Sequence, residues 1–325
     1  MKNQPFVTIG VPVYNGEKFI IDALESIKNQ TYTNFNCHIV NNVSTDRTKE
    51  LVTEFVKTDS RFILHTFDEF IDAAGNWNRT VKFITDKTKY FHVIQADDII
   101  SHDCLESHIT LMEKYPDAGI ASSFRMVGKK LRGYGLDYFG GNLWEGKEIL
   151  LKQLKREIGV VGTITNDFYR VEHLKKLSFY PEIFKTEDIH FDNRLALEML
   201  FISNLVFSFK ILSMTKKKHL ESATATTVRK FNTSIHAKEN TLYRFKRYFP
   251  ELEKTYAIER RRYAFFMLMN YLSLNRSRLI WHKTHLRRKI RFTEYVSGII
   301  WENLFSRLLY LIKQRYFVKY KMSSN

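Results

Sequence analysis

The chain has 325 residues, of which 44% are hydrophobic and 26% are charged, a balance typical of a globular protein with a sizeable core. Its 13 glycines and 5 prolines exclude collagen-like and linker-rich architectures. Its two cysteines, Cys37 and Cys104, form no CxxC pair, which argues against a disulfide scaffold or a zinc ribbon and favours a reducing, cytoplasmic compartment.

The net charge of +16 is unevenly distributed along the chain. Residues 257–325 hold 15 Lys/Arg and 3 Asp/Glu, whereas the first 256 residues hold 36 Lys/Arg and 32 Asp/Glu. This pattern predicts a nearly neutral body followed by a basic C-terminal region. We expect neither a signal peptide nor a membrane-spanning run.

Strand-like runs alternate with segments of helical spacing over residues 1–125. The predicted strands are Val7–Val11, Phe35–Val40, Phe62–Phe67, Tyr90–Ile94 and Gly119–Phe124. The predicted helices are Glu17–Asn29, Thr45–Lys57, Asn76–Thr85 and Cys104–Lys114. Strands joined by helices of this length are typical of parallel βαβ units, so we predict an α/β fold with a mostly parallel sheet.

The remainder of the chain has a mixed pattern and then a helical one. Helices are predicted near Lys147–Lys155, Val171–Leu177 and Asp188–Leu200, and a strand at Leu205–Ser213. From about Thr241 the spacing is helical throughout. We therefore predict a catalytic domain over residues 1–240, with a nucleotide-binding part to about 125 and an acceptor part from about 126, and a basic helical region over 241–325.

Three polar clusters follow predicted strands, at Pro12–Asn15, Asn41–Asp46 and Gln95–Asp98. Ligands of parallel α/β sheets bind beyond the carboxyl ends of the strands. The three clusters are therefore expected to line one crevice.

Asp97 and Asp98 are candidate metal ligands. They follow the strand Tyr90–Ile94 directly, and hard divalent cations such as Mg²⁺ and Mn²⁺ prefer oxygen ligands. The alternative is that this acidic pair only begins a turn and caps the next helix. The strand in front of the pair and the other polar clusters favour the metal site.

Two further segments carry candidate chemistry. Glu187 and Asp188 open an apolar helical run, where one carboxylate suits a general base, although acids in a first helical turn are also favoured by the helix dipole. His219 follows three lysines and is a candidate ligand for the metal or contact for a diphosphate; a solvated surface turn is the alternative. Trp77, Asn76 and Asn78 could face a nucleotide, or serve as core and helix cap.

The order of these segments resembles the family 2 glycosyltransferases over about Val7–Thr224. The similar segments are Val7–Gly16, Glu17–Ile20, Ser26–Tyr32, Val40–Asp46, Ala74–Arg79, Gln95–Asp98, and Glu187–Asp188 with Arg194–Ala196. Each motif is short, but their succession is specific. The resemblance implies the A-type glycosyltransferase fold, a single Rossmann-like nucleotide-binding domain, here with a basic α-helical extension.

The resemblance also implies roles for individual residues. Asp188 would be the base of an inverting transfer, with Glu187 beside it. Mn²⁺ or Mg²⁺ would be held against the donor diphosphate by Asp97 and Asp98, with His219 as a further ligand. The implied nucleotide-binding residues are Pro12, Val13, Tyr14, Asn15, Glu17, Asn41, Ser44, Asn76, Asn78, Ala96 and Asp97.

Three motifs depart from the family pattern. Asn41 and Asn42 stand where the second-strand loop usually carries acids, which leaves the nucleotide open because an amide both donates and accepts. Gln95 replaces the first acid of the metal motif and removes one charge. His190 stands where a second acid often follows the Glu-Asp pair.

The basic region has a pattern of its own. Ile299, Ile300, Leu304, Leu308 and Leu311 recur at helical spacing among lysines and arginines, as in amphipathic helices that bind anionic membranes. The alternative is a helical extension that packs on the body. The membrane interpretation suits a lipid-linked or growing cell-surface glycan as acceptor, at the inner face of the plasma membrane.

Two other classes of function compete with the transferase. A nucleic-acid-binding protein would explain the basic charge and the many aromatics, but not the acid clusters at strand ends, and no nucleic-acid-binding signature is visible. A catalytically silent module of the same fold would explain Asn41 and Gln95, whereas Asp97 and Asp188 argue against it.

Overall fold

The computed structural model describes residues 4–132, 135–136, 141–159, 161, 163–178, 180–184, 191–215 and 240–272. For residues 191 and 264–272 it describes the backbone alone. The chain divides into two compact units, Met1–His219 and Leu220–Asn325, and the sheet lies in the first.

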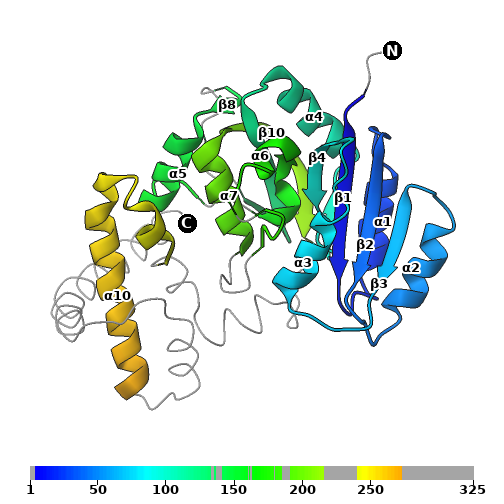
Figure 1. The fold of residues 1–325 in the computed structure, drawn as a ribbon, viewed down its shortest axis with the longest axis horizontal. Helices are drawn as coiled ribbons and strands as arrows, with labels where there is room; N and C mark the ends of the chain where they lie inside the picture. The colour runs from blue at the N-terminus through cyan, green and yellow to red at the C-terminus, as the bar shows by residue number, and fades with distance from the viewer. Residues whose placement is uncertain are drawn as a thin grey trace, which may run out of the picture. The chain divides into compact units, whose positions relative to one another are not determined.

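Four apolar strands form the parallel half of the sheet, in the order β3-β2-β1-β4 (Figure 1). Seven of the eight residues of β1 are buried, as expected for a parallel strand covered on both faces. The elements of this half are β1 (Phe6–Val13), α1 (Ile20–Lys28), β2 (Phe35–Asn41), α2 (Thr48–Val56), β3 (Phe62–Thr66), α3 (Ala73–Val81) and β4 (Thr88–Val93). The structure confirms the corresponding predicted elements, with ends that differ by a few residues.

The other half of the sheet is mixed, so the prediction of a mostly parallel sheet is corrected. Strand β9 lies between β4 and β6 and is antiparallel to both, and β5 is antiparallel to β10. The predicted strands at β6 and β10 are confirmed and run parallel to each other. Strands β5 and β9 have three residues each, too few for alternation to be visible in the sequence.

The helices and strands of the mixed half of the sheet span the following residues. They are β5 (Asp98–Ile100), α4 (Cys104–Lys114), β6 (Ala118–Val127), β7 (Lys130–Arg132), β8 (Leu143–Trp144), α5 (Gly146–Lys155), the 3₁₀ turn η2 (Ile164–Asn166), β9 (Phe168–Arg170), α6 (Val171–Leu174), α7 (Phe191–Ile202) and β10 (Asn204–Thr215).

Helix α3 packs directly on β1 at Gly10. A Cβ added at Gly10 would lie 2.4 Å from the Cβ of Thr80 on α3, far inside van der Waals contact. The absent side chain at position 10 therefore sets the distance between α3 and the sheet, and with it the position of the asparagines that α3 carries.

The second unit is helical where the structure describes it. Residues 240–245 are helical, and the 3₁₀ turn η4 (Pro250–Leu252) and helix α10 (Glu253–Leu272) follow. Of the three consecutive arginines at 260–262, Arg260 is buried and Arg262 pairs with Glu259 at 2.8 Å. Among the residues that the structure describes, no helix is long and apolar enough to cross a membrane. Residues 216–239 and 273–325 lie outside the description, so the boundary near residue 240 and the amphipathic pattern around Ile299 stay predictions.

We expect Gly10→Ala to lower the free energy of unfolding by about 1–3 kcal/mol, because the new methyl group overpacks the contact with Thr80. Urea unfolding followed by far-UV circular dichroism measures the change. Thr53→Ala, on the exposed face of α2, is the control and should change stability by less than about 0.5 kcal/mol. Equal stability of Gly10→Ala and wild type would contradict the close packing of α3 on β1.

Candidate active site

The loops that follow β1 and β2 are joined by hydrogen bonds. Asn15 has a φ of 51°, a left-handed conformation that asparagine tolerates better than most residues. Its N–H donates to Ser44 Oγ at 3.0 Å, and its Oδ1 accepts from the N–H of Thr45 at 2.8 Å. The N–H of Gly16 donates to Thr48 Oγ1 at 2.8 Å. These bonds bring together two of the three predicted polar clusters.

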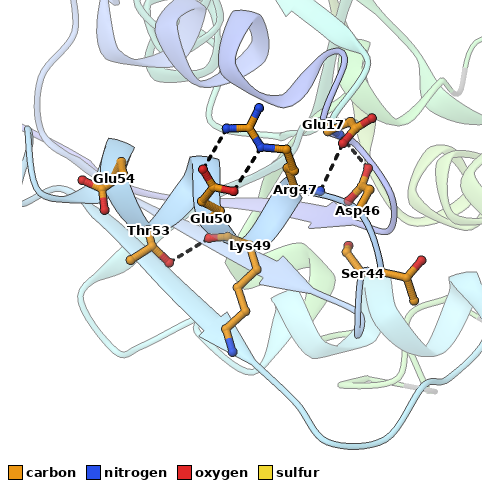
Figure 2. A pocket seen from close by; sticks show the side chains of 9 residues that line it. Glu17, Ser44, Asp46, Arg47, Lys49, Glu50, Thr53 and Glu54 are labelled. Carbon is orange, nitrogen blue, oxygen red and sulfur yellow. Dashed lines mark hydrogen bonds and ion pairs between the residues drawn. The ribbon is translucent and has the colours of Figure 1, made fainter.

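An open groove of about 590 Å³ adjoins these loops and the start of α2 (Figure 2). Its lining residues are Glu17, Ser44, Thr45, Asp46, Arg47, Lys49, Glu50, Thr53 and Glu54. Glu17 and Asp46 lie close together there: the N–H of Glu17 donates to Asp46 Oδ2 at 3.0 Å, and Glu17 Oε2 accepts from the N–H of Arg47 at 3.1 Å. Arg47 pairs with Glu50 at 2.8 Å. Acids outnumber bases along this lining, so the groove does not suit the phosphates of a nucleotide.

Asp46 stays ionised at this junction. Burial raises its pKa, but hydrogen bonds from Thr48 and from the backbone N–H of Glu17 outweigh burial, and the net pKa lies below the ordinary value. Asp46 therefore acts as an acceptor that joins the start of α1 to the start of α2. Glu17, expected to contact a nucleotide, here bonds the backbone of the neighbouring loop.

Asn41 and Asn42 end β2 in different ways. Asn41 lies opposite Val13 in the parallel register and is buried, and its Oδ1 accepts from the N–H of Ser44 at 3.3 Å. Asn42 bonds the backbone N–H and C=O of Ile71, and its Oδ1 also accepts from Arg79 at 3.0 Å. Asn42 therefore ties the end of β2 to the segment before α3.

Tyr14 and Phe70 present aromatic surface beside this segment. Their rings meet edge to face with centroids 4.9 Å apart, and Tyr14 is 49% and Phe70 56% exposed. Tyr14 was expected at a nucleotide, whereas Phe70 was not recognised, because a single aromatic residue in a loop carries no sequence signal. An exposed aromatic pair at the edge of the loops suits stacking on a planar base.

The side chains of the two asparagines of α3 form hydrogen bonds with the backbone of the protein. Asn76 is buried and donates to Val40 O at 3.3 Å; its Oδ1 has no partner within the described part of the chain. Asn78 uses both polar atoms on the backbone of Phe184. The ring of Trp77 also contacts Phe184, with centroids 5.3 Å apart.

The segment Gln95–Asp98 leaves the end of β4 as predicted. The N–H of Gln95 donates to Thr165 Oγ1 at 3.1 Å, and Ala96 and Asp97 are half-buried. Asp98 begins β5 and is 2% exposed, and its Oδ1 accepts from the hydroxyl of Thr215 at the end of β10. Thr215 Oγ1 in turn accepts from Arg125 at 2.7 Å. Asp98 is therefore bonded back into the sheet.

A buried polar network lies beside this segment. Burial raises the pKa of Asp167 well above its ordinary value, even though Ser122 donates to Oδ1 at 2.9 Å and Tyr169 to Oδ2 at 3.2 Å. Asn166 donates to Ser123 O at 2.6 Å. These residues, and Thr165, Arg125 and Thr215, are not among the predicted site residues, because nothing in their spacing distinguishes them from ordinary loop and strand residues.

The predicted base and the third metal ligand lie outside the described residues. These are Asp188 with Glu187 beside it, and His219; His190, a departure from the family pattern, also lies outside the described residues. Within the described ranges no group of three or more His, Cys, Asp or Glu side chains is placed to hold a metal ion. The carboxylates of Asp97 and Asp98 nevertheless match the oxygen donors that Mg²⁺ and Mn²⁺ prefer.

The sequence of the chain is similar to a known protein family and to curated relatives. Glycosyl transferase family 2 matches residues 8–178, more than half of the chain. An uncharacterised glycosyltransferase of Haemophilus influenzae is 30% identical over 147 residues, which cover 45% of each chain. This chain thus matches about half the length of that relative.

Two solved structures share the fold. TarS of S. aureus in complex with UDP-GlcNAc gives a TM-score of 0.57 at 17% identity, over 74% of this chain and 66% of TarS. The mannosyltransferase PcManGT of Pyrobaculum calidifontis, in complex with GDP-Man and Mn²⁺, gives a TM-score of 0.57 at 16% identity, over 94% and 88%. These structures show that the chain has the A-type fold implied by the family resemblance. Because the family model matches residues 8–178, the chain belongs to glycosyl transferase family 2.

Proposed function

We propose that the chain is an inverting glycosyltransferase that moves a sugar from a nucleotide-sugar donor to an acceptor hydroxyl. One observation carries this proposal: hydrogen bonds join the loops after β1 and β2, and the acidic segment follows β4, the other neighbour of β1. The chain that has this arrangement is a member of the family. The carboxyl ends of parallel strands are where α/β sheets bind nucleotides.

The nucleoside is expected along the first two loops. The exposed ring of Tyr14 offers stacking surface, and Asn41 has its Oδ1 bonded to Ser44, which leaves Nδ2 to donate to a base. Asn15 and Ser44 shape this surface through their hydrogen bond, and Pro12 and Val13 are the last two residues of β1 before it. Fold neighbours bind UDP-GlcNAc and GDP-Man, which supports a nucleotide sugar without selecting a base.

A divalent cation, Mn²⁺ or Mg²⁺, is expected at Asp97. Asp98 has one carboxylate oxygen bonded to Thr215, so it contributes through its other oxygen, and His219 is the proposed further ligand. PcManGT contains Mn²⁺ with its donor. When bound, such a cation neutralises charge on the diphosphate that leaves.

The acceptor is activated by a carboxylate of the chain, proposed as Asp188 with Glu187 beside it. As the acceptor oxygen bonds to the anomeric carbon, its proton passes to this carboxylate, and the bond from that carbon to the diphosphate oxygen breaks. Attack opposite the leaving group inverts the anomeric centre, and no covalent enzyme intermediate forms. Water has to be excluded from the donor, because water would take the place of the acceptor.

The acceptor proposed for this enzyme is a lipid-linked or growing cell-surface glycan. Residues 257–325 carry 15 basic and 3 acidic residues, and basic segments bind anionic membranes with about 1 kcal/mol for each Lys or Arg. The chain would then work as a peripheral protein at the cytoplasmic face of the membrane that holds its acceptor.

We expect wild type to release nucleoside diphosphate slowly from one nucleotide sugar in a panel, and a chelator to abolish the release. Asp97→Ala should lower the rate about a hundredfold or more, because a cation stabilises developing charge by several kcal/mol. Asp86→Ala, exposed before the opposite end of β4, is the control and should keep the wild-type rate.

A second readout separates the remaining outcomes. If wild type releases nothing, thermal shift with each nucleotide shows whether a nucleotide binds. Stabilisation by one nucleotide would mean that the reaction waits for its acceptor. No response to any nucleotide or sugar would contradict the proposal and favour a catalytically silent module of the same fold.

The full chain should sediment with vesicles of phosphatidylglycerol and phosphatidylcholine, and less so as salt rises. Replacing Arg287, Arg288, Lys289 and Arg291 by alanine should weaken this binding roughly a hundredfold, because four contributions of about 1 kcal/mol are lost. The control replaces four exposed lysines of the first unit: Lys49, Lys82, Lys129 and Lys175. Equal loss in both variants would show that the basic region is not the membrane contact.

A further inference from the structure

Asn78 forms a two-point clamp on the backbone of one residue, Phe184, far away in the sequence. The N–H of Phe184 donates to Asn78 Oδ1 at 2.9 Å, and Asn78 Nδ2 donates to Phe184 O at 2.6 Å. A backbone N–H can only donate and a carbonyl oxygen can only accept, so these partners fix the orientation of the amide. Both polar atoms of Asn78 are therefore engaged by the protein, although the family resemblance places this residue at the nucleotide.

The clamp is held in a packed environment. Phe184 is 1% exposed and Ile183 is fully buried, and the ring of Trp77 meets that of Phe184 at an interplanar angle of 88°. Asn78 itself is fixed in space, because α3 lies against β1 at the contact between Gly10 and Thr80. The backbone at Phe184 is thus tied to the sheet by side-chain packing and by two hydrogen bonds.

Phe184 is three residues before Glu187 in the sequence, and the chain is held again after Asp188. In the first turn of α7, Asn193 Nδ2 donates to Val161 O at 3.1 Å, and Leu195 and Ala196 are buried. The two asparagines therefore hold the chain on either side of the acidic pair that is proposed to contain the base.

We infer that Asn78 is a positioning residue for the general base and makes no contact with the nucleotide. This inference rests on the proposed function, since it assigns Asn78 to the step that Asp188 performs. Catalysis by a positioned base is sensitive to displacement, and a shift of about 1 Å far from the reacting atoms can lower the rate about a hundredfold. Loss of the clamp therefore acts on the transfer step, with binding of the donor preserved.

The test compares Asn78→Ala and Asn78→Asp with wild type and with Asn142→Ala. Asn142 is the matched control, because its Nδ2 also donates to a backbone carbonyl, Phe207 O at 2.8 Å, near the start of β10 and away from the carboxyl ends of the strands. Asn78→Asp keeps an acceptor for the N–H of Phe184 and places a carboxylate oxygen against its carbonyl. A carboxylate at position 78 would also repel a diphosphate, if one lay there.

We expect kcat to fall tenfold or more in both Asn78 variants. The KM for the donor should stay within about twofold of wild type, and so should the Kd values of UDP and GDP measured with Mn²⁺. Asn142→Ala should keep the wild-type kcat. A tenfold rise in nucleotide Kd, larger for Asn78→Asp than for Asn78→Ala, would overturn the inference and return Asn78 to the nucleotide. Unchanged kcat in both variants would also overturn it.

Hydrogen exchange followed by mass spectrometry gives a readout that needs no turnover. The amide of Phe184 should exchange faster in Asn78→Ala than in wild type and Asn142→Ala, because its acceptor is gone, while peptides of β1 and β4 keep their protection. Failure of the proposed function would appear as wild type without turnover or nucleotide binding. If instead the wild type is active, the inference fails in either of two cases: the Asn78 variants lose nucleotide affinity, or they keep the wild-type kcat.

Discussion

The loops at the carboxyl ends of β1 and β2 satisfy their polar backbone groups with each other. A loop that leaves a buried parallel strand carries N–H groups that need partners, and burial without partners is costly. Here the N–H groups of Asn15, Gly16 and Glu17 all find side-chain acceptors on the neighbouring loop. Each loop therefore depends on the other for these hydrogen bonds, and the parallel register of β1 and β2 is what brings the two loops together.

The chain uses asparagine repeatedly for the same physical task. An amide side chain presents an NH₂ donor group and a carbonyl acceptor side by side, and can therefore pair with the backbone N–H and C=O of one residue. Asn42 does so with Ile71 and Asn78 with Phe184. These bonds connect segments that no strand pairing joins. Asn78, which the family resemblance places at the nucleotide, thus forms hydrogen bonds within the protein that fix the arrangement of its segments.

The sequence predicted most of the first half of the fold, because β1 to β4 and their helices are long enough to show periodicity, and their loops carry the family pattern. It predicted less of the second half. Strand β9 has three residues, and its place between β4 and β6 depends on pairing across the sheet. Asp97 was found by its position after a strand, whereas Thr165 and Thr215 are ordinary hydroxyl residues until the fold brings them to Gln95 and Asp98.

The contact of Arg125 with Thr215 has a consequence for Asp98. A guanidinium group donates and never accepts, so the oxygen of Thr215 receives a hydrogen from Arg125, and its own hydroxyl proton is directed to Asp98. The three groups form a chain of hydrogen bonds with one direction, which runs from the guanidinium to the carboxylate. One oxygen of Asp98 is therefore engaged by the fold itself, before any other group approaches this carboxylate.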